Sequence, residues 1–446
     1  MANKQIDVPA LIDGARLGAF QVLAITLCGL ALLMDGFDIQ MIGFVAPAIV
    51  QDWNIDKAAL GPVFAAGLGG LLVGSFALSV AADKWGRRPV LIASTLFFGV
   101  CMLLTPLATT LAGLGAARFF AGLGLGAILP NAMALAGEYA PQRVRVTVLM
   151  LVGVCFGVGA ILAGLLSTVL LPRWGWQSVF LAGGVVPVAC AVAMFVRLPE
   201  SIQFLVLRGR HAAARKWLRR IDAAAVADEQ AELKVKEPAP GGAPVFDLFA
   251  GGRARMTLLL WGVNLLNLLT VYFLANWIPT VVRGAGRPLG DAVLAGTALQ
   301  AGGTFGALVL GVVIDRVGFR RVLLACFMLA AVAVFSVGRL DMAGSQLFIA
   351  VSVAGFCVIG GQGAVNALST SYYPTALRST GIGWALGIGR FGSILGPLLG
   401  GEFLKMGLPT SSIFLVLAVP PVVCSLLVWA MEPGRRAPAV PAANAA

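Results

Sequence analysis

Long apolar runs separated by short polar breaks recur along the whole chain. A helix needs about 20 apolar residues to cross the hydrocarbon core of a bilayer. Period-two alternation is absent, and lipid requires backbone groups to be satisfied internally, so the runs predict membrane-spanning helices rather than a barrel. Twelve runs qualify, at about residues 20–46, 58–80, 89–107, 110–135, 146–170, 177–197, 256–281, 290–313, 321–340, 345–370, 378–402 and 410–431.

Composition strengthens this interpretation. Hydrophobic residues make up 59% of the 446 positions and charged residues only 12%, whereas a soluble domain carries about 25% charged residues. The 56 glycines suit membrane helices that pack closely through small side chains. We therefore predict an all-α polytopic membrane protein.

The basic residues predict its orientation. Lys and Arg gather in every second break, and the remaining breaks hold only Lys57, Arg173, Arg283, Arg287, Arg339 and Lys405. Cytoplasmic loops carry the excess of Lys and Arg, so both termini are expected on the cytoplasmic side. Because the net charge of +12 is concentrated in these breaks, it reflects topology and gives no reason to expect a nucleic-acid partner.

The runs divide the chain into five parts. We expect a retained cytoplasmic tail (1–19), a six-helix bundle (20–197), a cytoplasmic central loop (198–255), a second six-helix bundle (256–431) and a cytoplasmic tail (432–446). Within the central loop, "RGRHAAARKWLRRI" fits either a basic amphipathic helix on the inner membrane surface or a solvated linker. The sequence leaves both interpretations open.

The two predicted bundles resemble each other at an offset of about 233 residues. "SVAADKWGRRP" (79–89) aligns with "GVVIDRVGFRR" (311–321), and "EYAPQRVRVT" (138–147) aligns with "SYYPTALRST" (371–380). "GAILAGLL" (159–166) also aligns with "GSILGPLL" (392–399). Three matches near one offset indicate a duplicated six-helix unit. Parallel repeats of this kind are typical of two-bundle transporters.

Two acids, Asp35 and Asp38, interrupt the first run one helical turn apart on one face. A charged acid near the bilayer centre costs about 2.5 to 3.5 kcal/mol, and neighbouring carboxylates repel, which favours a bound proton. Arg118, inside the fourth run, is the candidate counter-charge, although the sequence does not say for which acid. We predict that these three residues couple transport to protons; a permanently neutralised structural pair is the alternative.

Arg390 is the one arginine deep in the second bundle, about 18 Å beyond Arg378 along a helix. A guanidinium grips a carboxylate with two parallel hydrogen bonds, so we predict that Arg390 binds a substrate carboxylate. An interhelical salt bridge, or a place nearer the interface, would also explain it.

Other polar and aromatic residues of the runs suit an aromatic ligand. Candidate ring contacts are Phe37, Phe44, Tyr272, Trp277, Trp384 and Phe391, and candidates for orienting a ring hydroxyl are Asn264, Asn267, Gln362 and Asn366. Each residue alone is more often a packing or interhelical contact than a ligand contact.

Two levels of resemblance follow from motifs. "SVAADKWGRR" (79–88) and "GVVIDRVGFR" (311–320) resemble the major facilitator signature G-x-x-x-D-[RK]-x-G-[RK]-[RK], with Ser79 replacing a glycine and Phe319 a basic residue. The D-G-x-D motif of Asp35, Gly36 and Asp38 looks like the marker of the aromatic acid:proton symporters. It is accompanied by "RFFAGLGLGAILPNAMALAGEYAP" (118–141) and "LPESIQFL" (198–205).

The resemblance implies two pseudo-symmetric six-helix bundles that import a hydroxybenzoate or benzoate with protons into a bacterial cell across the inner membrane. It implies no cofactor, and we expect the chain to act as a monomer. It also implies a cytoplasmic gate that locks the halves together in the outward-open state. The residues matched to this gate are Asp83, Gly86, Arg87, Arg88, Glu138, Arg145, Asp315, Gly318, Arg320 and Arg378.

Other functions fit less well. A proton antiporter exporting organic compounds, or an importer of a non-aromatic acid, stays open as an alternative. An enzyme is not expected, because the sequence has a single histidine, His211, and its seven cysteines lie in apolar runs without a C-x-x-C pair. A phosphate-binding G-x-x-x-x-G-K-[ST] loop is also absent, so an ion gradient must supply the energy.

Overall fold

A computed structural model describes residues 5–222, 228, 231–235, 245–339, 344–374 and 377–431, apart from the side chains of Ser79 and Ser379. In this part of the chain, eleven helices are long and apolar enough to cross a membrane. The predicted tail 432–446 and part of the predicted central loop lie outside the described residues.

The spanning helices form two groups. The first half contains α2 (Ala19–Trp53), α3 (Gly61–Trp85), α4 (Arg87–Leu104), α5 (Leu111–Leu125), α6 (Ile128–Tyr139) and α7 (Gln142–Arg197). The second half contains α10 (Ala254–Gly284), α11 (Leu289–Val317), α12 (Phe319–Val337), α13 (Gly344–Tyr372), α14 (Arg378–Lys405), α15 (Thr410–Leu417) and α16 (Val419–Ala430). Short 3-10 turns lie at η1 (Lys57–Leu60), η2 (Thr105–Leu107) and η3 (Val245–Leu248).

Helix α7 explains why eleven helices make twelve spans. Its 56 residues would extend about 84 Å if straight, roughly twice the thickness of a bilayer. Gly175 has φ 72° and ψ 178°, which no helix contains, so the chain folds back there into two spans. The predicted runs 146–170 and 177–197 lie on either side of this turn, and the predicted all-α fold of two six-helix bundles is confirmed.

The largest difference from a predicted boundary lies at the end of the first run. The first run was expected to end at residue 46, yet α2 continues through Pro47 to Trp53. Membrane helices tolerate proline because neighbouring groups satisfy the carbonyl that proline leaves free.

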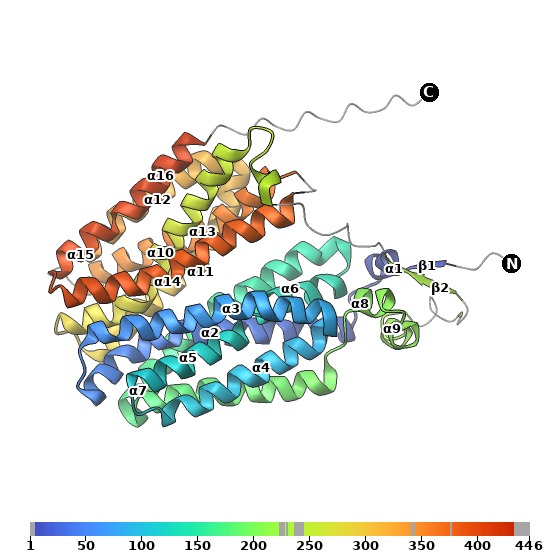
Figure 1. Ribbon diagram of the computed structural model, residues 1–446, viewed down its shortest axis with the longest axis horizontal. Helices are drawn as coiled ribbons and strands as arrows, with labels where there is room; N and C mark the ends of the chain where they lie inside the picture. Colours follow the sequence, from blue (N-terminus) through green and yellow to red (C-terminus); the bar gives the residue numbers. More distant parts are fainter. Residues whose placement is uncertain are drawn as a thin grey trace.

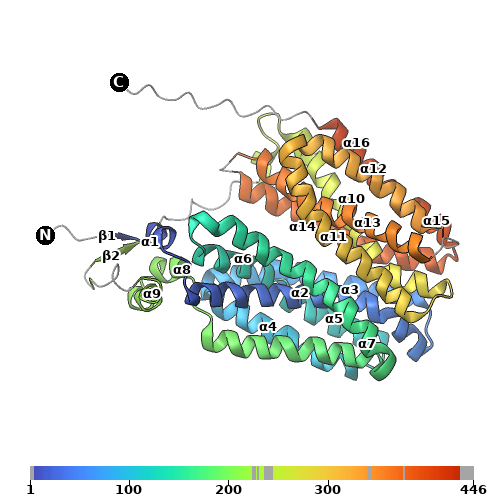
Figure 2. The same ribbon diagram turned by 180° about the vertical axis from the view of Figure 1, so that it is seen from behind.

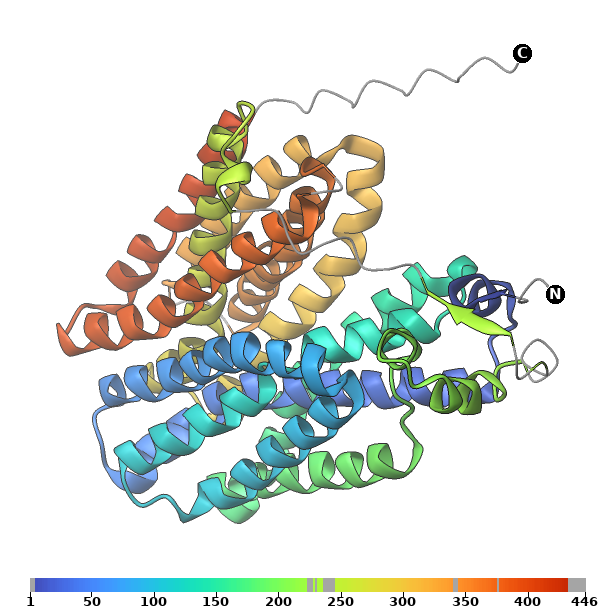
Figure 3. The same ribbon diagram turned by 45° about the vertical axis from the view of Figure 1, so that its right-hand side comes forward.

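The two halves diverge along their length (Figures 1 and 3). The described chain begins and ends at the same end of the molecule, where Figure 2 shows α1 and α9 beside the first half. We call this the basic end, because Arg87, Arg145 and Arg320 lie there, and the other the opposite end. Across the halves, α2 packs against α10, α3 against α14, and α7 against α11.

Glycines show where these contacts are tight. Near the opposite end, a Cβ on Gly43 of α2 would lie 2.6 Å from the carbonyl oxygen of Ala275 in α10, and one on Gly401 would lie 2.9 Å from that of Ala58. Nearer the basic end of α14, a Cβ on Gly383 or Gly387 would meet nothing within 4 Å. The halves are therefore closed against each other at the opposite end and apart toward the basic end.

The internal repeat is visible in one turn. Gly86 between α3 and α4 has φ 107° and ψ 157°, and Gly318 between α11 and α12 has φ 91° and ψ 152°. Both conformations strongly favour glycine. The tight turns predicted at these two glycines are therefore present, with nearly the same geometry in both halves.

The segments at the basic end of the first half are folded. Strand β1 (Gln5–Asp7) pairs in parallel with β2 (Glu232–Lys234), and the short helices α1 (Val8–Gly14), α8 (Ile202–Leu207) and α9 (His211–Leu218) accompany them. In α9, Ala214 and Leu218 are buried and Trp217 stacks on Phe20 at 5.8 Å. The solvated-linker interpretation is wrong for α9, whose apolar face packs against protein.

Candidate functional site

A bidentate ion pair lies inside the first half. Arg118 of α5 donates from Nη1 to Asp38 Oδ1 and from Nη2 to Asp38 Oδ2, both at 2.7 Å. Asp38 is 0% exposed and Arg118 3% exposed. Phe180 of α7, 6.0 Å from the guanidinium carbon, covers one side. The structure thus answers the question left open by the sequence: Arg118 pairs with Asp38.

A small cavity adjoins this pair at the boundary between the halves. The volume open to water in this cavity is about 20 Å³, which is enough for one water molecule. Arg118 Nε is buried without a hydrogen-bond partner among the described residues. Of the described residues lining the cavity, Asn276 of α10 alone comes from the second half. The sequence analysis missed Asn276, although an amide within an apolar run was a signal.

Asp35 has different surroundings one turn earlier in α2. Its side chain is buried, at 3% exposed, and its Oδ1 atom has no hydrogen-bond partner among the described residues. Gly36 follows it because α7 approaches there: a Cβ on Gly36 would overlap the Phe156 carbonyl group. The glycine of the D-G-x-D motif therefore seats α2 on α7 and fixes the acids at this depth.

Arg390 of the second half lies within electrostatic range of Asp35 and of Tyr272 in α10. No carboxylate of the described residues forms an ion pair with the Arg390 side chain, which is half-buried. Gly387, one turn earlier in α14, has open space beside it. An acid of the first half therefore lies within electrostatic range of a guanidinium of the second half, and a phenol of the second half lies within range of both.

Four amide side chains form a hydrogen-bonded cluster between α10 and α13. Gln362 Nε2 donates to Asn264 Oδ1 at 2.9 Å and to Asn366 Oδ1 at 3.0 Å. Asn267 Nδ2 donates to Gln362 Oε1 at 2.8 Å and to the Val358 carbonyl at 3.0 Å. The four predicted amides are thus brought together, and in this structure they bond to each other across two helices.

Two of the predicted aromatic residues lie in the contact between the halves. Trp277 is 0% exposed, its Nε1 donates to the Pro397 carbonyl at 3.0 Å, and its ring meets the Phe64 ring edge to face at 5.2 Å. Phe44 of α2 packs against Gly296 of α11. Both residues therefore help to close the opposite end.

The remaining aromatic residues are also dispersed. Phe37 packs against Gly183 inside the first half. Trp384 stacks on Trp261 at 5.9 Å nearer the basic end, with 43% of its surface exposed, and Phe391 is exposed. The structure does not gather the predicted ring contacts into one pocket.

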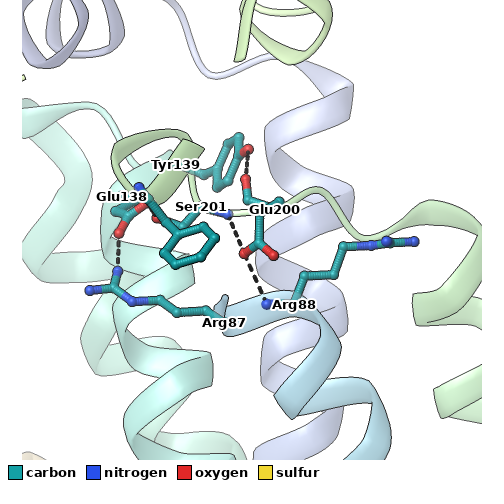
Figure 4. A network of polar contacts seen from close by, with 7 residues as sticks. Arg87, Arg88, Glu138, Tyr139, Glu200 and Ser201 are labelled. Atoms are coloured by element: carbon teal, nitrogen blue, oxygen red, sulfur yellow. Dashed lines mark hydrogen bonds and ion pairs between the residues drawn. The ribbon is translucent and has the colours of Figure 1, made fainter. Parts of the chain in front are cut away.

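A network of polar contacts occupies the basic end of the first half (Figure 4). Arg87 forms an ion pair with Glu138, whose other oxygen accepts a 2.7 Å bond from Ser201 Oγ. Glu200 Oε1 accepts the backbone N–H of Arg88 at 3.0 Å. The sequence analysis gave no role to Glu200 or Ser201, although an acid directly after the sixth span was a signal.

The other predicted gate residues also make contacts within one half. Arg145 pairs with Asp13, and Arg320 Nη2 donates to the Trp429 carbonyl at 2.7 Å. Four members are exposed: Asp83, Asp315, Gly318 and Arg378. Among the described residues, no hydrogen bond or ion pair of the predicted gate crosses between the halves in this structure.

Two duplicated helical bundles, closed at one end, apart at the other and holding opposite charges between them, define a membrane transporter rather than an enzyme. The Major Facilitator Superfamily model matches residues 28–293 and 260–445. The chain belongs to the Major Facilitator Superfamily.

Known relatives are similar over nearly the whole chain. A gallate transporter of Pseudomonas putida is 38% identical over 430 residues, which cover 95% of each protein. A 4-hydroxybenzoate transporter of Pseudomonas aeruginosa is 37% identical over 421 residues, covering 94% of each. A benzoate transport protein of Acinetobacter baylyi is 30% identical over 440 residues, covering 97% of this chain and 94% of the relative.

Solved structures share the fold. The xylose transporter XylE of E. coli, in a partially occluded inward open conformation, has a TM-score of 0.69 at 15% identity, over 93% of this chain and 100% of that one. A bacterial homologue of the lysosomal transporter Spinster, in an inward-facing conformation, has a TM-score of 0.71 at 16% identity, covering 93% of this chain and 99% of that one.

Proposed function

We propose that this transporter imports a small aromatic carboxylate, such as a hydroxybenzoate or benzoate, together with protons. The observation that carries the proposal is Arg390, which has no ion pair among the described residues and lies within electrostatic range of the buried acid Asp35. The relatives named as gallate, 4-hydroxybenzoate and benzoate transporters support the aromatic class.

The basic end is assigned to the cytoplasm of a bacterial cell, with the transporter in the inner membrane. The excess of Lys and Arg in the breaks at this end supports the assignment. Because the halves are apart toward the basic end, the structure then corresponds to an inward-facing state. The contacts of Trp277 with Phe64 and of Gly43 with Ala275 close the outer side.

The chemistry of binding follows from the charges. A substrate carboxylate that leaves water needs a counter-charge, and Arg390 offers two parallel hydrogen bonds. Tyr272 lies within electrostatic range of Arg390 and is the phenol proposed to contact the same ligand. Gln362 and Asn366, which are hydrogen-bonded to each other in the amide cluster, are proposed to exchange that bond for one with a ring hydroxyl.

Energy comes from the proton gradient, without a cofactor, through the group of Asp35, Asp38 and Arg118. The exposed gate residues Asp315 and Arg378 would meet partners in the other half when the basic end closes in the outward-facing state, where a breakable charge network holds the halves together. We propose that one chain is sufficient for this cycle.

Uptake by purified protein in lipid vesicles tests the function. The uptake of four labelled acids is measured with an acidic exterior, with an alkaline exterior and without a gradient. The four acids are 4-hydroxybenzoate, gallate, benzoate and succinate. The aromatic acids should accumulate when the exterior is acidic, and protein-free vesicles should account for passive entry. Lower accumulation with an acidic exterior would support an antiporter instead, and uptake of succinate alone would point to a non-aromatic acid.

A further inference from the structure

We propose that Asp35, and not Asp38, carries the coupling proton, and that Arg390 is held in turn by ionised Asp35 and by the substrate carboxylate. This inference rests on the proposed import of an aromatic carboxylate. It assigns different roles to two acids that the D-G-x-D motif presents as equals.

Asp38 is unsuited to carry the proton because both of its oxygens are already bound. Arg118 donates one 2.7 Å bond to each oxygen, and neither residue is more than 3% exposed. Protonating Asp38 would leave the Arg118 charge buried without its partner, which is strongly unfavourable. The pair therefore remains ionised through the cycle and holds α2 to α5.

Asp35, unlike Asp38, can gain or lose a proton without breaking an ion pair of this structure. Its buried Oδ1 has no hydrogen-bond partner among the described residues, so the ionised form needs a counter-charge from elsewhere. The charged side chains within electrostatic range of Asp35 are Arg390 on α14 and Asp38 on its own helix, and Tyr272 on α10 lies within range of both Asp35 and Arg390. On the α7 side, the Phe156 backbone packs against Gly36.

One guanidinium can grip one carboxylate bidentately at a time. While Asp35 is ionised, it competes with the substrate for Arg390. When a proton from the outer water forms the O–H bond of Asp35, Arg390 is released to bind the substrate carboxylate. On the inner side the substrate leaves, the proton returns to water, and Asp35 again neutralises Arg390. Substrate and proton are thereby obliged to move together.

The matched variants Asp35→Asn and Asp38→Asn test this assignment in lipid vesicles. Asp35→Asn imitates the protonated acid, so exchange of external for internal labelled 4-hydroxybenzoate should be retained at a rate that no longer depends on pH, while accumulation driven by an acidic exterior is lost. Asp38→Asn leaves Arg118 unpaired and should lose both activities.

Binding as a function of pH gives the sharper readout. For the wild type, one linked proton makes the affinity for 4-hydroxybenzoate fall about tenfold per pH unit on the alkaline side of the titration. In Asp35→Asn the affinity should not change with pH. If Asp35→Asn does not fold, Asp35→Glu replaces it: this variant keeps a carboxylate and should keep both the pH slope and coupled accumulation.

The outcomes separate the inference from the function it rests on. The role of Asp35 is overturned if the wild type exchanges 4-hydroxybenzoate and Asp35→Asn still shows the full pH dependence of affinity. It is equally overturned if Asp35→Asn still accumulates the ligand. Loss of the pH slope in a folded Asp35→Glu would overturn it as well. If the wild type exchanges none of the aromatic acids, the proposed function itself fails.

Discussion

The two halves differ in the polar side chains that they bury at mid-depth. The first half buries a charged pair, Asp38 with Arg118, in which each oxygen is bound at 2.7 Å. The second half buries neutral amides such as Asn267, which are bonded to one another, and its Arg390 has no ion pair among the described residues. The two copies of the repeat thus hold charge differently. One copy pairs its buried charges internally, and the other carries an arginine that we propose binds the substrate carboxylate.

Breaking the charged pair should have the largest effect. Asp38→Ala leaves Arg118 buried without a counter-charge, which should lower the free energy of unfolding by about 3 to 5 kcal/mol and abolish transport. The matching change in the second half, Asn366→Ala, removes one neutral acceptor of Gln362 and should cost about 1 kcal/mol. Thermal unfolding of the purified variants in detergent measures both.

A double variant, Asp38→Leu with Arg118→Met, serves as the control for that comparison. Removing both charges should restore most of the lost stability but not transport. A double variant as unstable as Asp38→Ala would contradict a dominant charge effect.

Removing the available cation should have the next largest effect. Arg390→Ala removes the partner of the carboxylate, and a hydrogen-bonded charge pair contributes about 1.5 to 3 kcal/mol, so 4-hydroxybenzoate should bind roughly 10- to 100-fold more weakly. Arg390→Lys keeps the charge without the fork of donors and should be intermediate. Equilibrium binding of labelled ligand measures the loss, and unchanged affinity in Arg390→Ala would remove the carboxylate site.

The amide cluster should affect selectivity more than overall affinity. Gln362→Leu removes the donor shared by Asn264 and Asn366, so binding of 4-hydroxybenzoate should weaken by about 1 kcal/mol, roughly fivefold, while benzoate is unaffected. Competition between the two ligands measures the ratio. An equal loss for both would show that the cluster is structural only.

The smallest effect is expected at the one contact of the second half with the charged pair. Asn276→Leu removes the amide that lines the cavity beside Arg118 and should slow uptake by roughly two- to fivefold, because a single net hydrogen bond is involved. The control is Thr280→Val, one turn further along α10, whose hydroxyl has no partner among the described residues. A loss as large in the control would exclude a specific role for Asn276.

The sequence predicted the features that depend on local pattern. The length of the apolar runs predicted the spans. The turns at Gly86 and Gly318 were predicted by a loop motif that recurs at a fixed offset. Arg118 and Arg390 were selected from the sequence because a charged side chain inside a membrane is energetically costly and usually has a partner or a function.

Features that depend on three-dimensional packing could not be predicted. Asp35 and Asp38 share one helical face, so only the packed position of α5 shows that Arg118 reaches Asp38. The contacts of the aromatic candidates could not be predicted for the same reason: hydrophobicity does not distinguish Trp277, in the contact between the halves, from a residue that lines a pocket. The pairing of β1 with β2 joins segments from distant parts of the chain and leaves no local pattern.

Proton entry driven by substrate alone tests the central claim most directly. Vesicles containing the purified protein and an internal pH dye, with equal pH inside and outside, receive external 4-hydroxybenzoate. With the wild type, the lumen should acidify faster than in protein-free vesicles. With Arg390→Ala, it should acidify no faster than in protein-free vesicles. This comparison separates transport by the carrier from passive entry of the neutral acid. Uptake of labelled 4-hydroxybenzoate by the wild type without acidification beyond the protein-free rate would contradict proton-coupled import.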